Sequence, residues 1–334
     1  MAKIRDLTLT DIPKLNKLMS FLETDAKSFL DGINLPFPFS LLNKICPMRL
    51  KIVPESYVLT DKNDILACIS VKKFDGNHKK WKISKLFMSD NPFDTGLLLI
   101  QYVITKFAAK GVHTFIANVD DTQDEIIRIF VDGAGFRQCS RLQMWHYNDC
   151  VQKEYSLDGY QIRPFKNSDA QAVAELYNES ILPHFRPSLS KHKCEFYENI
   201  FVGLMHNTEF RYVIEDKQRK QIVCYCILST SDNKNYIMDG VISKGYENLF
   251  ETILNYGYKQ AQKRTADLNF FAINRYYMQS STHIENVLRE NSYSPMNSSA
   301  ILVKDLFRIA KSENQVKQVV FYNDINSNPA FDKL

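Results

Sequence analysis

Hydrophobic and polar positions alternate along the chain with two periods, one typical of strands and one of helices. The segment SYVLTDKNDILACISVKKF, which begins at Ser56, has two apolar runs around a polar turn and predicts an antiparallel strand pair. A further apolar run reaches Met88. After a loop from Ser89 to Gly96, the pattern predicts an apolar helix from Gly96 to Ala109. A strand is then expected from Thr114 to Val119.

This order of elements occurs twice. The stretches KIRDLTLTDIPKLNKLM, from Lys3, and QIRPFKNSDAQAVAELY, from Gln161, both have an Asp seven residues after the Ile of an Ile-Arg pair and continue as an amphipathic helix. The first strand pair has a counterpart in RYVIEDKQRKQIVCYCILST from Arg211, HTFIANV has one in LNFFAIN, and Phe136 has one in Tyr293. The offsets all lie between 155 and 158 residues, which predicts a duplication.

We therefore expect two tandem domains of one fold, residues 1–148 and 159–306, joined by the polar stretch from Asn148 to Gly159. Residues 307–334 form a tail outside the repeat, in which QVVFY adds a strand or stays loose. The repeated order of strands and helices predicts an α/β fold with a mixed sheet and helices on both faces. Capping boxes are expected to open the third helix of each domain, at Thr122 with Glu125 and at Thr282 with Glu285.

Composition and charge narrow the class of protein. The formal net charge of +4 is small for 334 residues and the basic residues are scattered, which argues against a nucleic-acid partner. Because no run of about 18 apolar residues occurs and the alternation begins at Lys3, we expect neither a membrane span nor a secretory signal. Seven cysteines without disulfide spacing are typical of a cytoplasmic protein. Cys224 and Cys226 predict a buried core strand, with a metal site as the alternative.

The strand, loop and helix around Met88, together with the closing sequence GAGF, resemble the GNAT superfamily of acyl-CoA-dependent N-acyltransferases. The resemblance covers residues 2–147 and 159–306. It implies an acyl-CoA cofactor, in the simplest case acetyl-CoA, held between the diverging fourth and fifth strands of the first domain. The cofactor-binding residues that it implies are Leu86, Phe87 and Met88 for the pantetheine arm, Thr95, Gly96 and Leu97 for the pyrophosphate, and Asn118 for a pantetheine hydrogen bond, with Asn274 as its counterpart.

The loop departs from the family's phosphate motif, Arg/Gln-x-x-Gly-x-Gly/Ala. With Gly96 as the last small residue, Asn91 stands at the Arg/Gln position and Asp94 at the first glycine. Asp94 either brings a carboxylate towards phosphate or serves as the N-cap of the helix. The second loop, VISKGYENLFETIL, has Lys244 and Gly245 without the motif's spacing. The sequence therefore predicts a weakened phosphate site.

The expected general acid is missing. The family places a Tyr five residues before the Phe of Gly-Phe, where this sequence has Val131 and Leu288. Tyr276, Tyr277 and Tyr293 lie near in sequence and are less suitable alternatives.

The candidate catalytic base is Asp239, in the middle of the predicted strand NYIMDGVI. The alternative is a structural carboxylate at a strand kink beside Gly240. The carboxylates of NVDD, from Asn118 to Asp121, are expected to favour the N-terminus of the next helix.

The segments from Phe21 to Glu55 and from Glu179 to Phe210 are rich in proline and aromatic residues. The resemblance implies that they line the acceptor cleft, and the alternative is packing between the domains. The histidines of the second segment, His184, His192 and His206, lack metal-ligand spacing, and no metal site is predicted. No Walker, Rossmann, nucleophile-elbow or zincin motif occurs.

Two functions follow. One is an acyl-CoA-dependent N-acyltransferase in which the first domain binds the coenzyme and the second shapes the site for a small-molecule or peptide amine. The other is a non-catalytic GNAT-like protein that binds a ligand or a partner.

Overall fold

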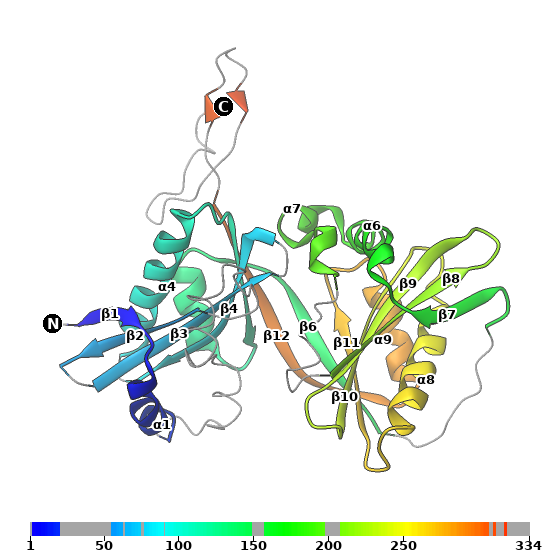
Figure 1. The fold of residues 1–334 in the computed structure, drawn as a ribbon, viewed down its shortest axis with the longest axis horizontal. Coiled ribbons are helices and arrows are strands. Elements are labelled where there is room, and N and C mark those ends of the chain that lie inside the picture. The colour runs from blue at the N-terminus through cyan, green and yellow to red at the C-terminus, as the bar shows by residue number, and fades with distance from the viewer. Residues whose placement is uncertain are drawn as a thin grey trace. The chain divides into compact units, whose positions relative to one another are not determined.

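A computed structural model describes residues 2–20, 55–62, 64–74, 77–89, 91–148, 157–197, 208–306, 310–311 and 317–318. The chain divides into two compact units. The first unit comprises Met1–Cys139 and Ile301–Leu334, and the second comprises Ser140–Ala300. Both units contain strands and helices (Figure 1).

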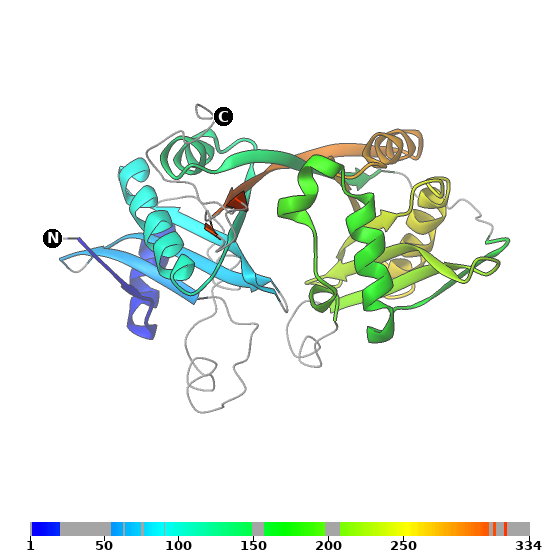
Figure 2. The same ribbon diagram turned by 90° about the horizontal axis from the view of Figure 1, so that it is seen from above.

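The first unit is a mixed sheet with the strand order β1-β2-β3-β4-β5-β12. Its strands β1 to β4 are antiparallel neighbours, whereas β4 and β5 are parallel. Figures 1 and 2 show α1 and α4 on opposite faces of this sheet. In chain order the elements are β1 (Lys3–Asp6), η1 (Leu9–Asp11), α1 (Ile12–Ser20), β2 (Glu55–Asp61), β3 (Asp64–Phe74), β4 (Asn77–Met88), α4 (Pro92–Ala108), β5 (Thr114–Asp120), α5 (Asp124–Arg128), η2 (Ile129–Gly133) and the start of β6 (Arg137–Tyr147).

Helix α4 packs on the sheet through apolar side chains at helical spacing, which include Leu99, Val103 and Phe107. Phe107 stacks on Trp81 of β4 with ring centroids 4.0 Å apart. The helix begins at Pro92, so the predicted start at Gly96 is wrong by one turn. Proline is favourable in the first turn because it has no N–H group that needs an acceptor.

The second unit repeats this plan, with β6 next to β11 in the strand order β6-β11-β10-β9-β8-β7. α6 lies on one face of its sheet and α8 on the other (Figure 1). Its elements are β7 (Tyr160–Pro164), η3 (Asn167–Asp169), α6 (Ala170–Ser180), η4 (Pro183–Phe185), α7 (Arg186–Leu189), η5 (Lys193–Glu195), β8 (Thr208–Asp216), β9 (Gln221–Thr230), β10 (Asn235–Ile242), α8 (Leu249–Gln262), β11 (Asn269–Arg275), α9 (Ser281–Glu290) and the start of β12 (Tyr293–Asp305).

Each unit is closed by a strand from the other half of the sequence. Residues 142–146 of β6 pair with β11 in the second unit. The end of β12 belongs to the first unit, where Asp305 accepts hydrogen bonds from Thr114 Oγ1 at 2.8 Å and from Arg137 at 3.0 Å. The compact units therefore differ from the predicted domains 1–148 and 159–306 in their last strands. In the predicted tail, β13 (Ala310–Lys311) pairs with β14 (Lys317–Gln318), and most of QVVFY lies outside the described residues.

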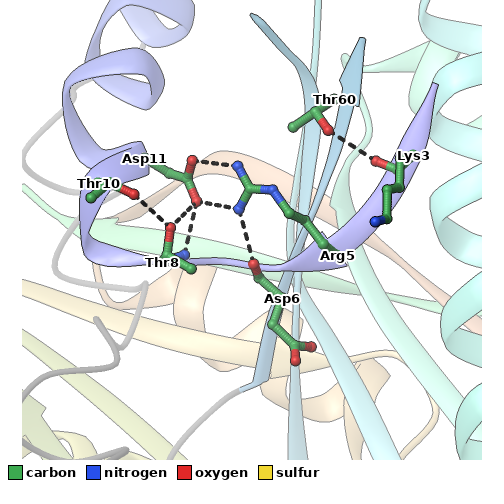
Figure 3. Close-up of polar contacts among 7 residues, drawn as sticks. All are labelled: Lys3, Arg5, Asp6, Thr8, Thr10, Asp11 and Thr60. Carbon is green, nitrogen blue, oxygen red and sulfur yellow. Dashed lines mark hydrogen bonds and ion pairs between the residues drawn. The ribbon is translucent and has the colours of Figure 1, made fainter. Parts of the chain in front are cut away.

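The repeated Ile-Arg pattern forms the same ion pair in both units. Arg5 donates to both carboxylate oxygens of Asp11 at 2.6 Å, and Thr8 donates to the same carboxylate (Figure 3). Arg163 donates to both oxygens of Asp169 at 2.7 and 3.0 Å. These hydrogen bonds from arginine lower the pKa of both aspartates. The pair fixes the turn between the first strand and the first helix of each unit.

The predicted capping boxes are not formed. α5 begins at Asp124, after Gln123, and Thr122 Oγ1 donates to Asp120 Oδ1 at 2.6 Å. The Asp120 carboxylate also accepts from Thr122 N. Thr122 is therefore hydrogen-bonded within the turn at the end of β5 and does not cap the helix. α9 begins at Ser281, one residue before Thr282.

Cys224 and Cys226 are buried in the core of the second unit, which confirms the prediction of a core strand. Burial raises the pKa of Cys224. Within the described residues, no cluster of His, Cys, Asp or Glu could hold a metal ion. None of the helices in the described part of the chain is long and apolar enough to cross a membrane.

Candidate functional site

The parallel strands β4 and β5 separate half-way along their length. Their ladder ends with Ile83 opposite Ala117, while β4 continues to Met88 and β5 to Asp120. Beyond this point, no ladder of described residues pairs the edge of β4 that faces β5. Such an edge offers backbone donors and acceptors to an extended molecule that carries amides.

A bulge marks the same point on the other edge of β4. The ladder with β3 passes from Val71 opposite Ile83 to Ser70 opposite Lys85, which leaves Ser84 as an extra residue. Ser84 Oγ donates to Ser70 O at 3.1 Å. The bulge redirects β4 where it leaves β5. This bulge is not predictable from the sequence, because one extra residue in a strand of mixed polarity leaves no clear pattern.

The residues predicted to bind coenzyme surround this gap. They are Leu86, Phe87 and Met88 at the end of β4, Thr95, Gly96 and Leu97 in the first two turns of α4, and Asn118 in β5 directly after the ladder. A Cβ atom on Gly96 would clash with Met88 Sδ. The glycine therefore allows α4 to pack closely on the end of β4.

The loop before α4 offers few groups to a phosphate. Pro92 has no N–H group and Thr95 N donates to Asn91 O at 3.3 Å, so the first-turn N–H groups without a helical acceptor are those of Phe93 and Asp94. The Asp94 carboxylate accepts from Asn91 Nδ2 at 2.8 Å. Asp94 lies inside the first turn and is not the N-cap, which is Asn91. From Ser89 to Gly96 the sequence has no basic residue.

The comparisons with known proteins bear on this arrangement. No family model matches the sequence, and no curated protein matches it. A solved structure of a tandem GNAT protein from the clavulanic acid biosynthesis pathway (without AcCoA) matches with a TM-score of 0.58 at 11% identity, over 91% of this chain and 98% of that chain. The chain has a tandem GNAT fold.

Two further GNAT-like structures match over nearly the whole chain. A GCN5-related N-acetyltransferase from Sphaerobacter thermophilus matches with a TM-score of 0.57 at 12% identity, over 91% of this chain and 95% of that one. A putative acetyltransferase from Pyrococcus horikoshii matches with a TM-score of 0.51 at 10% identity, over 96% and 92%. At these identities the likeness defines the fold, and it confirms the fold class predicted from the sequence.

In the second GNAT unit, the corresponding gap is bridged by the chain itself. The ladder of β10 and β11 ends with Met238 opposite Ala272. Ser180, the last residue of α6, donates from Oγ to Ile242 O at 3.1 Å, at the far end of β10. Gln279 N donates to Ser180 O at 2.9 Å, and Leu182 N donates to Tyr277 O at 3.0 Å. The segment from residue 180 to 182 is therefore bonded both to β10 and to the chain that follows β11.

Asp239, the predicted base, lies beside this bridge. Both of its carboxylate oxygens accept hydrogen bonds from the Arg275 guanidinium, and both side chains are 17% exposed. The ion pair lines a pocket of about 60 Å³ together with Tyr177, Phe196 and Tyr225. This pairing favours a structural role for the carboxylate. The pairing of Arg275 with Asp239 is not predictable from the sequence, because it depends on the register of β10 and β11.

Asn118 and Asn274 are not counterparts. Asn118 is exposed, whereas Asn274 is fully buried and donates to Ser281 O at 3.0 Å. Since the two ladders end at Ala117 and Ala272, the residue that corresponds to Asn118 is Ile273. The predicted match of Asn118 with Asn274 is one position out of register. The two side chains therefore lie on opposite faces of their sheets.

The position of the general acid is apolar in both units. Val131 is half-buried in the π-helix η2, and Leu288 is buried in the core of the second unit. Tyr276 OH donates to Glu285 at 2.7 Å. Tyr277 OH and Tyr177 OH are 2.9 Å apart, and burial raises the pKa of both.

Much of the predicted acceptor cleft, residues 21–54 and 198–207, lies outside the described residues, as does His206. Of the other two histidines there, His184 packs against Phe185 with ring centroids 3.8 Å apart. The His192 side chain accepts from Cys194 N at 3.3 Å.

Proposed function

We propose that the first GNAT unit binds an acyl-CoA, in the simplest case acetyl-CoA, and transfers the acyl group to an amine. The observation that carries this proposal is the edge of β4 beyond Ile83, next to the start of α4. The second unit has the same separation of strands, and residues 180–182 bridge it, whereas the residues that follow α1 in the first unit lie outside the described residues. We assign coenzyme binding to the first unit because its loop before α4 keeps Gly96, the last small residue of the family's phosphate motif.

The residues of the first unit fit the two parts of the coenzyme unequally. The pantetheine arm carries two amides, which the edge of β4 from Ser84 to Met88 can pair. The pyrophosphate would meet the N–H groups of Phe93 and Asp94 in a loop that has two carboxylates, Asp90 and Asp94, and no basic residue. The proposal is therefore weak binding through a well-formed arm site and a poor phosphate site.

The coenzyme supplies an acyl thioester, and the chain has to position the amine and receive its proton. Val131 cannot donate a proton from the usual position of the acid, so we expect slow turnover with water as the proton donor. The acceptor is a small-molecule or peptide amine. A cytoplasmic location is part of the proposal, in keeping with the free thiols of Cys68, Cys139, Cys194, Cys224 and Cys226.

Titration calorimetry with acetyl-CoA on the full chain tests the coenzyme site. Charge-assisted hydrogen bonds contribute about 1.5–3 kcal/mol each. The double substitution Asn91→Arg/Asp94→Gly adds a cation and removes a carboxylate, so it should tighten binding by about tenfold or more. A matched control is Glu247→Ala in the second unit, where Glu247 Oε2 accepts from Gly245 N at 2.8 Å. The control should leave the affinity unchanged.

Two results would contradict this assignment. If the unmodified chain binds acetyl-CoA with micromolar or better affinity and the double variant gives no gain, the loop binds phosphate in another way. If Glu247→Ala tightens binding and the double variant does not, the coenzyme site is in the second unit.

The second candidate function is binding without catalysis, and the apolar residues Val131 and Leu288 at the acid positions favour it. The release of free thiol from acetyl-CoA, measured against a panel of amines, separates the two functions. Coenzyme binding without thiol release above the rate of the uncatalysed reaction would establish the non-catalytic function.

A further inference from the structure

The β3–β4 hairpin of the first unit carries a high density of positive charge. Six of the 42 basic residues of the chain lie between positions 72 and 85. The expectation that basic residues are scattered is therefore wrong for this hairpin. The six are Lys72, Lys73, Lys79, Lys80, Lys82 and Lys85.

Four of these lysines share the sheet face opposite α4. Trp81 points towards α4, since it stacks on Phe107, so its neighbours Lys80 and Lys82 lie on the other face. Lys72 is directly opposite Lys82 in the β3–β4 ladder and therefore shares that face.

Beyond the bulge, Lys85 is directly opposite Ser70, which lies two residues before Lys72 on the same face. Ser70 Oγ and Ser56 Oγ are 2.7 Å apart, so two hydroxyl groups lie beside the lysines. We call Lys72, Lys80, Lys82 and Lys85 the lysine face.

The lysine face holds like charges close together. Lys72 and Lys82 are directly opposite each other in the ladder and both are half-buried. Lys80, on the same face, is 8% exposed.

The second unit shows that the fold does not require these lysines. Ile83 and Met238 are corresponding residues, because the parallel ladder of β4 with β5 ends at Ile83 and that of β10 with β11 ends at Met238. One residue earlier, where the first unit has Lys72 opposite Lys82, the second has Ser229 opposite Ile237. The charge is therefore a property of the first unit, in which we place the coenzyme.

We propose that the lysine face binds the anionic groups of the acyl acceptor, and that this acceptor is a small amine that carries carboxylate or phosphate groups. The inference rests on the proposed function. Lys82 and Lys85 flank Ile83 and Ser84, where β4 leaves β5, so an amine that reaches this gap has the lysine face beside it. From Lys80 to Lys85 the face extends about 17 Å along the strand, the length of a small molecule with more than one charged group.

The first test uses citrate and inorganic phosphate as probes on the full chain, by calorimetry at constant ionic strength. The unmodified chain should bind citrate, and Lys72→Gln/Lys82→Gln should bind it at least tenfold more weakly. Lys73→Gln/Lys79→Gln is the matched control, because it removes the same charge from the other face of the same hairpin. Equal citrate affinity in all three proteins, or an equal loss in both variants, would overturn the lysine face as an anion site.

The second test measures acetyl transfer to amines that differ in charge, namely glutamate against glutamine and O-phosphoserine against serine. The charged member of each pair should react faster, and Lys72→Gln/Lys82→Gln should abolish the difference without changing the affinity for acetyl-CoA. Preference for the neutral amines overturns the proposal. If none of the amines reacts, the proposal of an anionic amine acceptor is overturned, and citrate binding then shows only that the face binds anions.

Two other results separate this inference from the proposed function and from a larger partner. If citrate binding depends on the lysine face but acetyl-CoA does not bind, the proposed function fails and the face is not an acceptor site. If heparin or a single-stranded oligonucleotide binds at least 100-fold more tightly than citrate and requires the same lysines, the face belongs to a polyanion and the small acceptor is excluded.

Discussion

The ion pairs Arg5–Asp11 and Arg163–Asp169 show how a single residue fixes the same turn in both units. Each arginine donates to both oxygens of a carboxylate that opens the first helix. The Asp11 side chain is 3% exposed and the Arg5 side chain is 35% exposed, so loss of the arginine leaves a buried charge with fewer donors. The sequence repeat pointed to these residues without showing that they meet.

Arg5→Ala should lower the free energy of unfolding at pH 7 by about 2 kcal/mol, because the carboxylate loses two charge-assisted hydrogen bonds. Folding lowers the pKa of Asp11 below the value of about 4 that it has in the unfolded chain. The ion pair therefore contributes its full stability above about pH 4 and loses it as the pH falls towards the lowered pKa. The difference between the variant and the unmodified chain should therefore shrink in acid. Urea unfolding at pH 7 and pH 3 measures it.

Arg163→Ala is the matched variant in the second unit and should behave alike. The chain has two tryptophans, the buried Trp81 in the first unit and Trp145 in the second, so single-tryptophan variants report each unit by fluorescence. A difference that stays constant down to pH 3 would contradict the role of the aspartates.

Arg275→Met should destabilise the second unit by about 3–5 kcal/mol, since it leaves the Asp239 carboxylate buried without its guanidinium. The double variant Asp239→Leu/Arg275→Met should lie within about 1–2 kcal/mol of the unmodified chain. Unfolding followed through Trp145 gives both values. If Asp239→Asn instead abolishes acyl transfer and leaves stability unchanged, Asp239 is the base that the sequence suggested.

At the scale of elements, β4 combines several features: a parallel ladder, a bulge, an edge that no described strand pairs beyond Ile83, and one face with closely spaced lysines. The ladder of β10 with β11 ends at the corresponding position, but β10 pairs with β9 without a bulge there. This difference between two copies of one strand supports the proposed site more than the loop that follows β4 does.

Lys82→Ile copies Ile237 of the second unit and removes one charge from the pair opposite Lys72. Without added anions it should raise the free energy of unfolding by about 0.2–1 kcal/mol. The reciprocal change, Ile237→Lys, introduces a charge opposite Ser229 and should destabilise the second unit. Thermal unfolding in chloride buffer measures both, and a loss of stability in Lys82→Ile would show that Lys82 is needed for folding.

The sequence predicted most elements well and their ends less well. β10 spans Asn235–Ile242 as expected, because its apolar run is bounded by polar residues on one side. The start of α4 was missed because proline reads as a break, although in the first turn it fits a helix. The cap at Thr122 was missed because Asp120, a stronger acceptor two residues earlier, captures its hydroxyl.

At the scale of the whole molecule, the duplication was predictable and the exchange of last strands was not. Backbone hydrogen bonds between strands do not depend on residue type. The sequences of β6 and β12 therefore do not show which of the two units each strand completes. The contacts that distinguish them are polar and distant in sequence. Asp305 bonds Thr114 and Arg137 in the first unit, and Gln143 Nε2 donates to Met296 O at 2.8 Å in the second.

The exchange predicts how fragments behave. Residues 1–148 lack the end of β12, and residues 159–334 lack β6, so neither fragment should give a cooperative unfolding transition alone. Co-expressed, the two should form a complex that unfolds as the intact chain does. Calorimetric scans and sedimentation of each fragment and of the mixture measure this. Cooperative unfolding of the 1–148 fragment as a monomer would show that β6 can close the first unit.

The position of residues 301–305 in the chain also determines when the first unit can finish folding during synthesis. The first unit cannot be completed when its own half of the chain leaves the ribosome, because residues 301–305 are made about 180 residues after the end of β5 at Asp120. At about 5–20 residues per second, the edge of β5 lacks β12 for roughly 9–36 seconds. An open edge of this kind is a template for pairing with other chains. We therefore expect the yield of folded chain to depend on chaperones that bind the nascent strand during that interval.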